Sequence, residues 1–343
     1  MERALPDGRA SDKIPGLIQV SFIMSLSLQP STRLRRLLFV VVSVMFVCGP
    51  GRAQNKEPID VIKVSTDLVV FDAQVIDRKS KRVIGDLTKD DFEIYESGVK
   101  QQVSYFSRDE LPLSIMLLLD VSGSVRPILH QIRDGALNAL QRLKAADQVA
   151  VMAFASKSEL SQDFTNDRAL VSKTIEAATA SDRLGSGTFL GPALDEAAMH
   201  MQTAPTASSR RVIIIITDNI ATSFGMEKRI EEKLLDSGTV VYGLIVRGAI
   251  GKVFNIVSLG QIKGVDDYVK QTGGEVFGAS KNEVDAKLAV VIERLRARYA
   301  IGFRPTNEGA PEFRPVEIKL NGLRKRKEKP LVLTKRGYYL RPR

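Results

Sequence analysis

Two apolar runs in the middle of the chain each lead to an aspartate. The first covers residues 113–119 and ends at Asp120, and the second covers residues 212–216 and is followed by Thr217 and Asp218. Runs without polar alternation are typical of strands buried on both faces, at the centre of a parallel sheet between helices. The pattern therefore predicts such a sheet, with both carboxylates at the carboxyl ends of strands, where open α/β sheets bind their ligands.

Helical and extended patterns alternate through residues 111–298. Helices are expected at residues 127–143, 167–178, 192–202, 226–237, 265–271 and 282–298, and further strands at 148–154, 159–164, 239–246 and 275–277. The strand at 159–164 is expected at a sheet edge. This alternation predicts an α/β fold: a doubly wound, mostly parallel sheet with helices on both faces.

Shorter β patterns occupy both flanks, residues 55–110 and 299–343. Strands are expected at residues 67–76, 92–95, 102–106, 299–303, 313–320, 331–334 and 337–340, with a short helical turn capped by Thr88 before the second of them. Neither flank supplies a two-layer core, whereas together they reach the strand number of a small sandwich. We therefore expect one β-sandwich made from both flanks, joined to the α/β part at residues 109–112 and near Arg298.

Polar side chains beside the two apolar runs form a candidate metal site. Asp120 is followed by hydroxyls at every second position, and a glycine-rich loop at residues 185–188 presents a third hydroxyl just before a helix. Hydroxyls with few carboxylates suit a hard cation such as Mg²⁺, with Mn²⁺ or Ca²⁺ as alternatives. The candidate ligands are Asp120, Ser122, Ser124, Thr188 and Asp218.

The order of these motifs along residues 111–300 resembles the von Willebrand factor type A domain. That family's metal-ion-dependent adhesion site uses D-x-S-x-S, a loop threonine and a strand-end aspartate, which correspond here to residues 120–124, Thr188 and Asp218. The resemblance implies that the three hydroxyls hold the ion directly and the two carboxylates hold it through water. An open position is then left for an acidic side chain of a protein partner.

Two positions depart from the family pattern. Asn219 stands where the family usually has glycine, and Ser186 stands where it often has the first glycine of G-G-T. Asn tolerates positive φ better than most residues, and neither change removes a ligand oxygen. Upstream, G-D-L-T-K-D-D-F-E-I-Y-E-S-G at residues 85–98 and L-P-L-S from residue 111 resemble the bacterial exported VWFA-related family.

Three functions stay open from the sequence. The protein is expected to be a binding or adhesion module and not an enzyme, because no histidine or third carboxylate is placed near the candidate site by sequence. A metal-assisted hydrolase and a structural protein with a vestigial site are the alternatives. The two histidines, His130 and His200, lie on expected helices, and H-E-x-x-H, paired cysteines and a phosphate-binding G-x-x-x-x-G-K-[ST] motif are missing from the sequence.

The first 54 residues have the pattern of a secretory leader. Three arginines at residues 33–36 precede an uncharged apolar run at 37–47, and Gly51 and Ala53 then place small residues where a signal peptidase reads them. The run is too short to span a bilayer comfortably.

We expect cleavage near Ala53 and an exported chain that is periplasmic, envelope-associated or extracellular. An uncleaved anchor, a lipid-modified Cys48 and a start at Met24 are alternatives. Since Cys48 is the only cysteine, the mature chain would contain no disulfide.

Charge is concentrated at the carboxyl end. The 343 residues carry a formal net charge of +10, and residues 314–343 alone hold 11 Lys/Arg against two Asp/Glu. Such a segment could meet an anionic envelope surface, or it could be the solvated tip of a hairpin that turns at Asn321-Gly322. No specific nucleic-acid partner is expected. The whole chain, with 44% hydrophobic and 26% charged residues, has the composition of a globular protein.

Overall fold

The computed structural model describes residues 68–204, 209–218, 227–247, 265–305, 313–322 and 327–339. All of them fall in one structural unit, Ser65–Arg343. The expected leader lies outside the described residues. Within the described ranges, no helix has both the length and the apolar content that a membrane crossing would require.

A six-stranded sheet forms the centre of the α/β part. Its strands are β5 (Leu113–Asp120), β6 (Gln148–Phe154), β7 (Ser158–Thr165), β8 (Arg210–Thr217), β9 (Val240–Arg247) and β10 (Val276–Ser280). They lie in the order β10-β9-β8-β5-β6-β7, and every neighbouring pair is parallel except β6 with the edge strand β7. All eight residues of β5 are buried. The expected doubly wound, mostly parallel sheet is confirmed.

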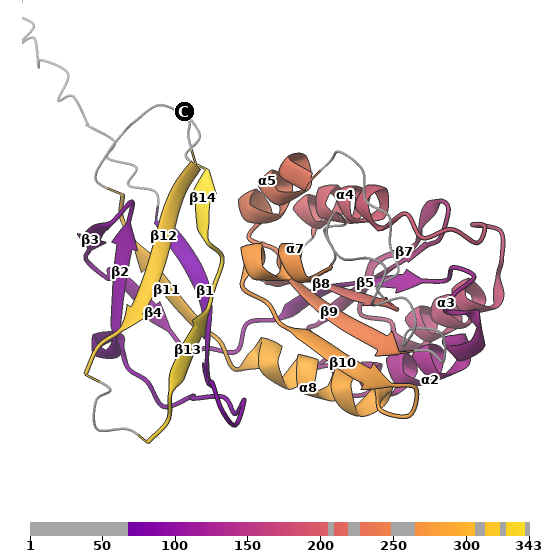
Figure 1. Cartoon of the computed structure of the whole chain (residues 1–343), viewed down its shortest axis with the longest axis horizontal. Coiled ribbons are helices and arrows are strands. Elements are labelled where there is room, and N and C mark those ends of the chain that lie inside the picture. The colour runs from indigo at the N-terminus through magenta and orange to yellow at the C-terminus, as the bar shows by residue number, and fades with distance from the viewer. Residues whose placement is uncertain are drawn as a thin grey trace, which may run out of the picture. The chain divides into compact units, whose positions relative to one another are not determined.

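Helices cover both faces of this sheet (Figure 1). On one face pack α2 (Leu129–Leu140), α3 (Arg168–Ala180) and α8 (Val284–Arg296), and on the other α4 (Leu190–His200), α5 (Glu227–Ser237) and α7 (Val265–Thr272). Side chains of β5 alternate between the two cores, with Leu117 in the first and Met116 in the second. A 3-10 turn, Arg126–Ile128, precedes α2 and contains Pro127, which is tolerated in a first turn because the N–H groups there have no intrahelical acceptor.

The two flanks together form a β-sandwich, as expected. Its strands are β1 (Val69–Asp77), β2 (Phe92–Glu96), β3 (Val99–Gln101), β4 (Tyr105–Ser107), β11 (Tyr299–Phe303), β12 (Phe313–Leu320), β13 (Pro330–Leu333) and β14 (Gly337–Tyr339). One sheet has the order β13-β1-β11-β4 and the other β14-β12-β2-β3, so each contains strands from both flanks. Phe71 and Ile301 from one sheet share a core with Ile94 and Ile318 from the other. The division of the chain at residues 111 and 298 into separate folding units stays a prediction.

The strand expected at residues 102–106 is wrong over residues 102–104, which form no strand, and only its last two residues belong to β4. The chain leaves β3, which pairs with β2, and enters β4, which pairs with β11 in the opposite sheet. Val103 is buried in the sandwich core at this crossing. A strand that changes sheets must interrupt its hydrogen-bond ladder, and an alternating pattern does not reveal that interruption. The capped turn before β2 is confirmed, because the carboxylate of Asp91 accepts from the Thr88 backbone N–H at 2.7 Å.

Buried arginines connect the sandwich to the α/β part. Arg210 at the start of β8 donates to the Asp72 carboxylate of β1 at 3.0 Å and to the Leu295 carbonyl of α8 at 2.7 Å. Arg298 donates to the Asp72 carbonyl at 3.0 Å and to the Tyr242 hydroxyl at 3.0 Å. A buried charge is tolerated only when it is paired and hydrogen-bonded, so these contacts fix the two parts in a specific relation.

Part of the basic carboxyl end contacts the folded chain. The Lys335 ammonium lies 4.8 Å from the centroid of the Phe71 ring, and Arg336 forms an ion pair with Glu231 and lies over the Phe313 ring. Residues 323–326, which include three of the basic residues, lie outside the described ranges. The expectation of an anionic partner surface stays a prediction.

Candidate metal site

Parallel pairing of β5 and β8 brings the two strand ends together. Leu119 lies opposite Ile216 in the ladder, so the next residues, Asp120 and Thr217, are neighbours. The Thr217 hydroxyl donates to Oδ2 of Asp120 at 2.6 Å. Asp218 follows directly, and its charge is among the influences that raise the pKa of Asp120. The two carboxylates predicted from separate apolar runs therefore occupy one corner of the sheet.

The turn after β5 folds back on the Asp120 carboxylate. Its Oδ1 accepts from the Ser122 backbone N–H at 2.9 Å, and the Ser122 and Ser124 hydroxyl oxygens lie 3.2 Å apart. The Val121 N–H donates to the Phe154 carbonyl at the end of β6, which anchors the turn from the other side. Asp120 and Ser122 are fully buried, and Ser124 is half-buried.

The glycine-rich loop is held against this turn by backbone contacts. The Gly123 N–H donates to the Ser186 carbonyl at 3.0 Å, and the Phe189 N–H donates to the Ala155 carbonyl at 2.9 Å. Gly185 has a backbone φ of +89°, a conformation that residues with a side chain rarely adopt. The two hydrogen bonds bracket Thr188, which is half-buried. The first ties its loop to the turn between Asp120 and Ser124, and the second ties it to the residue after β6.

Ser156 supports the site, although the sequence analysis did not identify it. Its hydroxyl accepts from the Gly187 N–H at 2.8 Å, one residue before Thr188. The position of Ser156 two residues after a buried strand was the available signal, since the carboxyl ends of parallel strands share one edge. A lone serine at a strand end is too common to be selected on that ground.

Burial dominates the electrostatics of Asp120. It raises the pKa of this carboxyl to about 6, against the hydrogen bonds from Ser122 and Thr217, which lower it. Among the described residues, no Lys or Arg forms an ion pair with Asp120. A buried carboxylate without a positively charged partner is costly, and a cation in the site would supply that charge. The donor set therefore fits a metal ion.

Oxygen spacing also suits a small divalent ion. Neighbouring ligands of an octahedral Mg²⁺ at 2.0–2.1 Å from the ion lie about 2.9 Å from each other. The hydroxyls of Ser122 and Ser124 are 3.2 Å apart, close to that value. Both Asp120 oxygens already accept hydrogen bonds from the protein, which favours contact with an ion through water. In the described parts of the chain, no group of three or more His, Cys, Asp or Glu is arranged to hold a metal, so a site here depends on hydroxyl ligands.

Residues 115–221 match the family model of the von Willebrand factor type A domain. No curated protein matches the chain. Similar solved structures include an aerotolerance-related membrane protein from Bacteroides fragilis, at 17% identity, TM-score 0.42, over 53% of this chain and 98% of that one. A von Willebrand factor type A protein from Catenulispora acidiphila has 12% identity and TM-score 0.43 over 71% and 72%. A mussel byssus matrix protein, described with a zinc-occupied MIDAS motif, has 15% identity and TM-score 0.41 over 54% and 48%. At these identities and TM-scores, the relatives' ligands and partners are not evidence about this chain.

Proposed function

Because the chain contains a von Willebrand factor type A domain, we propose that it is an exported binding protein that uses a divalent cation to hold an acidic side chain of a protein partner. Ser122, Ser124 and Thr188 would bind the ion directly. Asp120 and Asp218 would hold it through water. Mg²⁺ is the ion that best suits this set of oxygen ligands.

The observation that carries the proposal is the convergence of three separate segments around the turn that contains Asp120, a buried carboxylate that forms no ion pair with a described residue. Asp120 receives hydrogen bonds from Ser122 of its own turn and Thr217 of β8, while the Gly123 N–H holds the loop that presents Thr188. If Asp120 only capped the turn after β5, the loop that presents Thr188 would not need to be bound to the same turn. The arrangement supports a site built around an ion.

The ligand chemistry supports an acidic partner. If the two carboxylates hold the ion only through water, the ion keeps most of its positive charge. A further anionic ligand would then be favoured at an open coordination position. The exposed rim carries Phe189, 41% exposed and adjacent to Thr188, and Arg126, which lies 4.0 Å from Asp182. A partner that presents a carboxylate beside an apolar residue would suit this rim.

Hydrolysis is a weaker candidate, because histidine does not supply the general acid or base. His200 bonds to Asp163 at 2.8 Å and stacks on Phe164 beside the edge strand β7. His130 is exposed on α2. A purely structural role with a vestigial site is the third candidate, and it predicts no metal binding at all.

A partner-capture experiment tests the proposed function. The purified chain is immobilised and exposed to envelope extract of the native host in Mg²⁺, and then washed with a chelator. We expect a specific protein to elute with the chelator, and to be lost with Asp218→Ala. Asp134→Ala is the matched control, because Asp134 is an exposed α2 carboxylate that forms an ion pair with its neighbour Arg133. Retention of the same protein by Asp218→Ala would contradict a metal-bridged partner.

Export is tested separately by N-terminal sequencing of the protein from its host. The expected leader predicts a mature terminus near Gln54. A purified chain that still contains residue 30 would contradict cleavage.

A further inference from the structure

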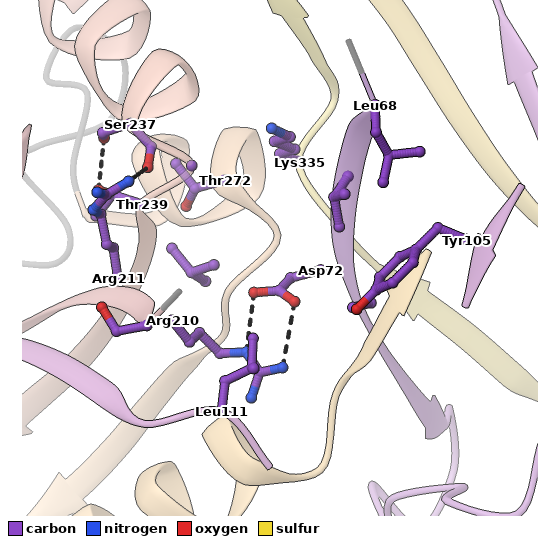
Figure 2. A pocket seen from close by; sticks show the side chains of 15 residues that line it. Leu68, Asp72, Tyr105, Leu111, Arg210, Arg211, Ser237, Thr239, Thr272 and Lys335 are labelled. Carbon is purple, nitrogen blue, oxygen red and sulfur yellow. Dashed lines mark hydrogen bonds and ion pairs between the residues drawn. The ribbon is translucent and has the colours of Figure 1, made fainter. Parts of the chain in front are cut away.

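A cavity of about 510 Å³ lies at the opposite end of the central sheet from the candidate metal site. Arg210 begins β8 and Thr217 ends it, so seven strand steps, about 23 Å, separate the two regions. The cavity is formed between the outer face of the β13-β1-β11-β4 sheet and the beginnings of β8 and β9 (Figure 2). Its volume is in the range of small-molecule binding sites.

One wall of the cavity is apolar and accessible. Leu68, Val70 and Tyr105 are 41%, 38% and 40% exposed, and they project from β4 and from the start of β1. Figure 2 shows Leu68 and Tyr105 on one side, with Arg211 on the other and Lys335 and Asp72 between them. Leu111 and Val240 extend the apolar surface. Large apolar side chains grouped around a hollow are unusual on a surface without a ligand.

The opposite wall carries more positive than negative charge. Three cations line the cavity, Arg210, Arg211 and Lys335, against one carboxylate, Asp72. Asp72 is already bound by Arg210, through Nε at 3.0 Å and Nη2 at 3.3 Å. The hydroxyls of Ser237 and Thr239 bond to each other at 2.7 Å. The remaining positive charge is that of Arg211 and Lys335.

Both of these cations have unused donor capacity. Nε of Arg211 is buried and has no hydrogen-bond partner among the described residues, while its Nη1 donates to the Ser237 carbonyl at 3.0 Å. Lys335 contacts the Phe71 ring but makes no hydrogen bond or ion pair within the described chain. Burial lowers the pKa of Lys335, although the charges of Asp72 and Asp236 oppose that shift. A cation that is buried without an anionic partner is costly, and an anion in the cavity would supply the opposite charge beside Arg211 and Lys335.

We propose that this cavity binds an amphiphilic anion, with its carboxylate or phosphate head between Arg211 and Lys335 and its apolar body against Leu68, Val70 and Tyr105. Two charge-assisted hydrogen bonds would fix the head, and burial of the chain would supply most of the affinity. Binding at this site requires no metal, so it is independent of the proposed function.

Calorimetry on the full chain tests the proposal with three probes: dodecanoate and dodecyl phosphate below their critical micelle concentrations, and dodecan-1-ol below its solubility limit. We expect at least one anion to bind at least tenfold more tightly than the neutral alcohol, in chelator as well as in Mg²⁺. The tighter of the two anions identifies the head group. Equal affinity for the alcohol would overturn the proposal, because the cavity would then be selecting only for apolar bulk. Failure of the full chain to bind either anion would also overturn it, including the case in which residues before Leu68 fill the cavity.

Variants separate the head group from the apolar wall. Lys335→Gln and Arg211→Gln should each weaken anion binding about tenfold, whereas Lys335→Arg should retain it. Val70→Asp places a carboxylate on the accessible wall and should abolish binding without disturbing a buried residue. Lys173→Gln, an exposed α3 position, is the charge-matched control and should bind like the wild type. Wild-type affinity in both Lys335→Gln and Arg211→Gln, or in a folded Val70→Asp, would contradict the assignment.

Discussion

The Thr217 hydroxyl donates a 2.6 Å hydrogen bond to Oδ2 of Asp120, and this bond joins the ends of two neighbouring strands at the candidate metal site. Asp120 arrives from β5 and Thr217 from β8, 97 positions later in the chain. The bond orients a fully buried carboxylate whose other oxygen, Oδ1, accepts from the Ser122 backbone N–H. The position of the carboxylate thus depends on both strands.

Replacing Thr217 by valine should therefore weaken the site and the fold together. The substitution keeps the side-chain volume but leaves Oδ2 of a buried carboxylate without its donor, which should cost about 1–3 kcal/mol in the free energy of unfolding. Urea unfolding at pH 7 in chelator measures this loss, and Thr217→Ser, which keeps the hydroxyl, should lose less. A valine variant as stable as the wild type would show that the bond contributes nothing to the fold.

Close packing of α2 on α8 depends on Gly135. A Cβ added there would lie 2.5 Å from Cγ1 of Val284, a buried side chain at the start of α8. Gly135→Ala should therefore destabilise the chain by about 1–3 kcal/mol, despite the higher helix propensity of alanine. Thermal unfolding of Gly135→Ala, Val284→Ala and the double variant forms a double-mutant cycle. The double variant should be more stable than the sum of the single effects predicts, and simple additivity would argue against the clash.

Asp77 at the end of β1 should titrate in strong acid. Hydrogen bonds from the Ser80 hydroxyl and backbone, and from the Lys329 backbone, lower its pKa from 3.8 to about 2. Because the folded-state value is depressed, the stabilisation is present above the unfolded value near 3.8 and is lost as the pH falls through about 2. Carboxyl chemical shifts measured by NMR should give a pKa near 2 in the wild type and a higher value in Ser80→Ala. An unchanged pKa in that variant would contradict the assigned cause.

The two flanks should lose structure together. Deleting residues 313–343 removes β12, the antiparallel neighbour of β2, and β13, a neighbour of β1. We expect amide exchange across Phe92–Glu96 to approach that of an unfolded chain, because β2 would keep only the three-residue strand β3 as a partner. Amides of β8 in the same sample are the internal control and should stay protected. Full protection of β2 after the deletion would contradict its dependence on β12.

The sequence predicted those parts of the fold that depend on local pattern. β6 runs over Gln148–Phe154, as the apolar run indicated, and the Thr88 turn follows directly from a local capping preference. The irregular link at residues 102–104 could not be predicted, because it lies where the chain passes from β3 in one sheet to β4 in the other. Pairing between strands that are distant in the sequence does not alter the hydrophobic periodicity of a short segment.

The candidate site shows the same limit. Its ligands stood out because Asp120 and Asp218 each follow a buried run and Thr188 lies in a glycine-rich loop before a helix, and the family resemblance assigned them to one site. The supporting Ser156 and Thr217 act through hydrogen bonds whose partners are distant in sequence, at 31 and 97 positions. The buried hydrogen bond between Arg210 and Asp72 was missed for the same reason. From the sequence alone, an arginine at the start of an apolar strand is expected to be exposed to solvent.

Calorimetric titration of Mg²⁺ and Mn²⁺ into the chelator-treated chain tests the central claim most directly. Asp120→Ala and Asp218→Ala both remove a carboxylate from the proposed site, while apolar burial holds the surrounding strands, so both variants should fold and neither should bind the ion. Asp134→Ala, an exposed carboxylate on α2, is the matched control and should bind like the wild type. We predict a saturable heat for the wild type and the control, and none for the two site variants. Equal heats for the wild type and a folded Asp120→Ala would contradict the metal site.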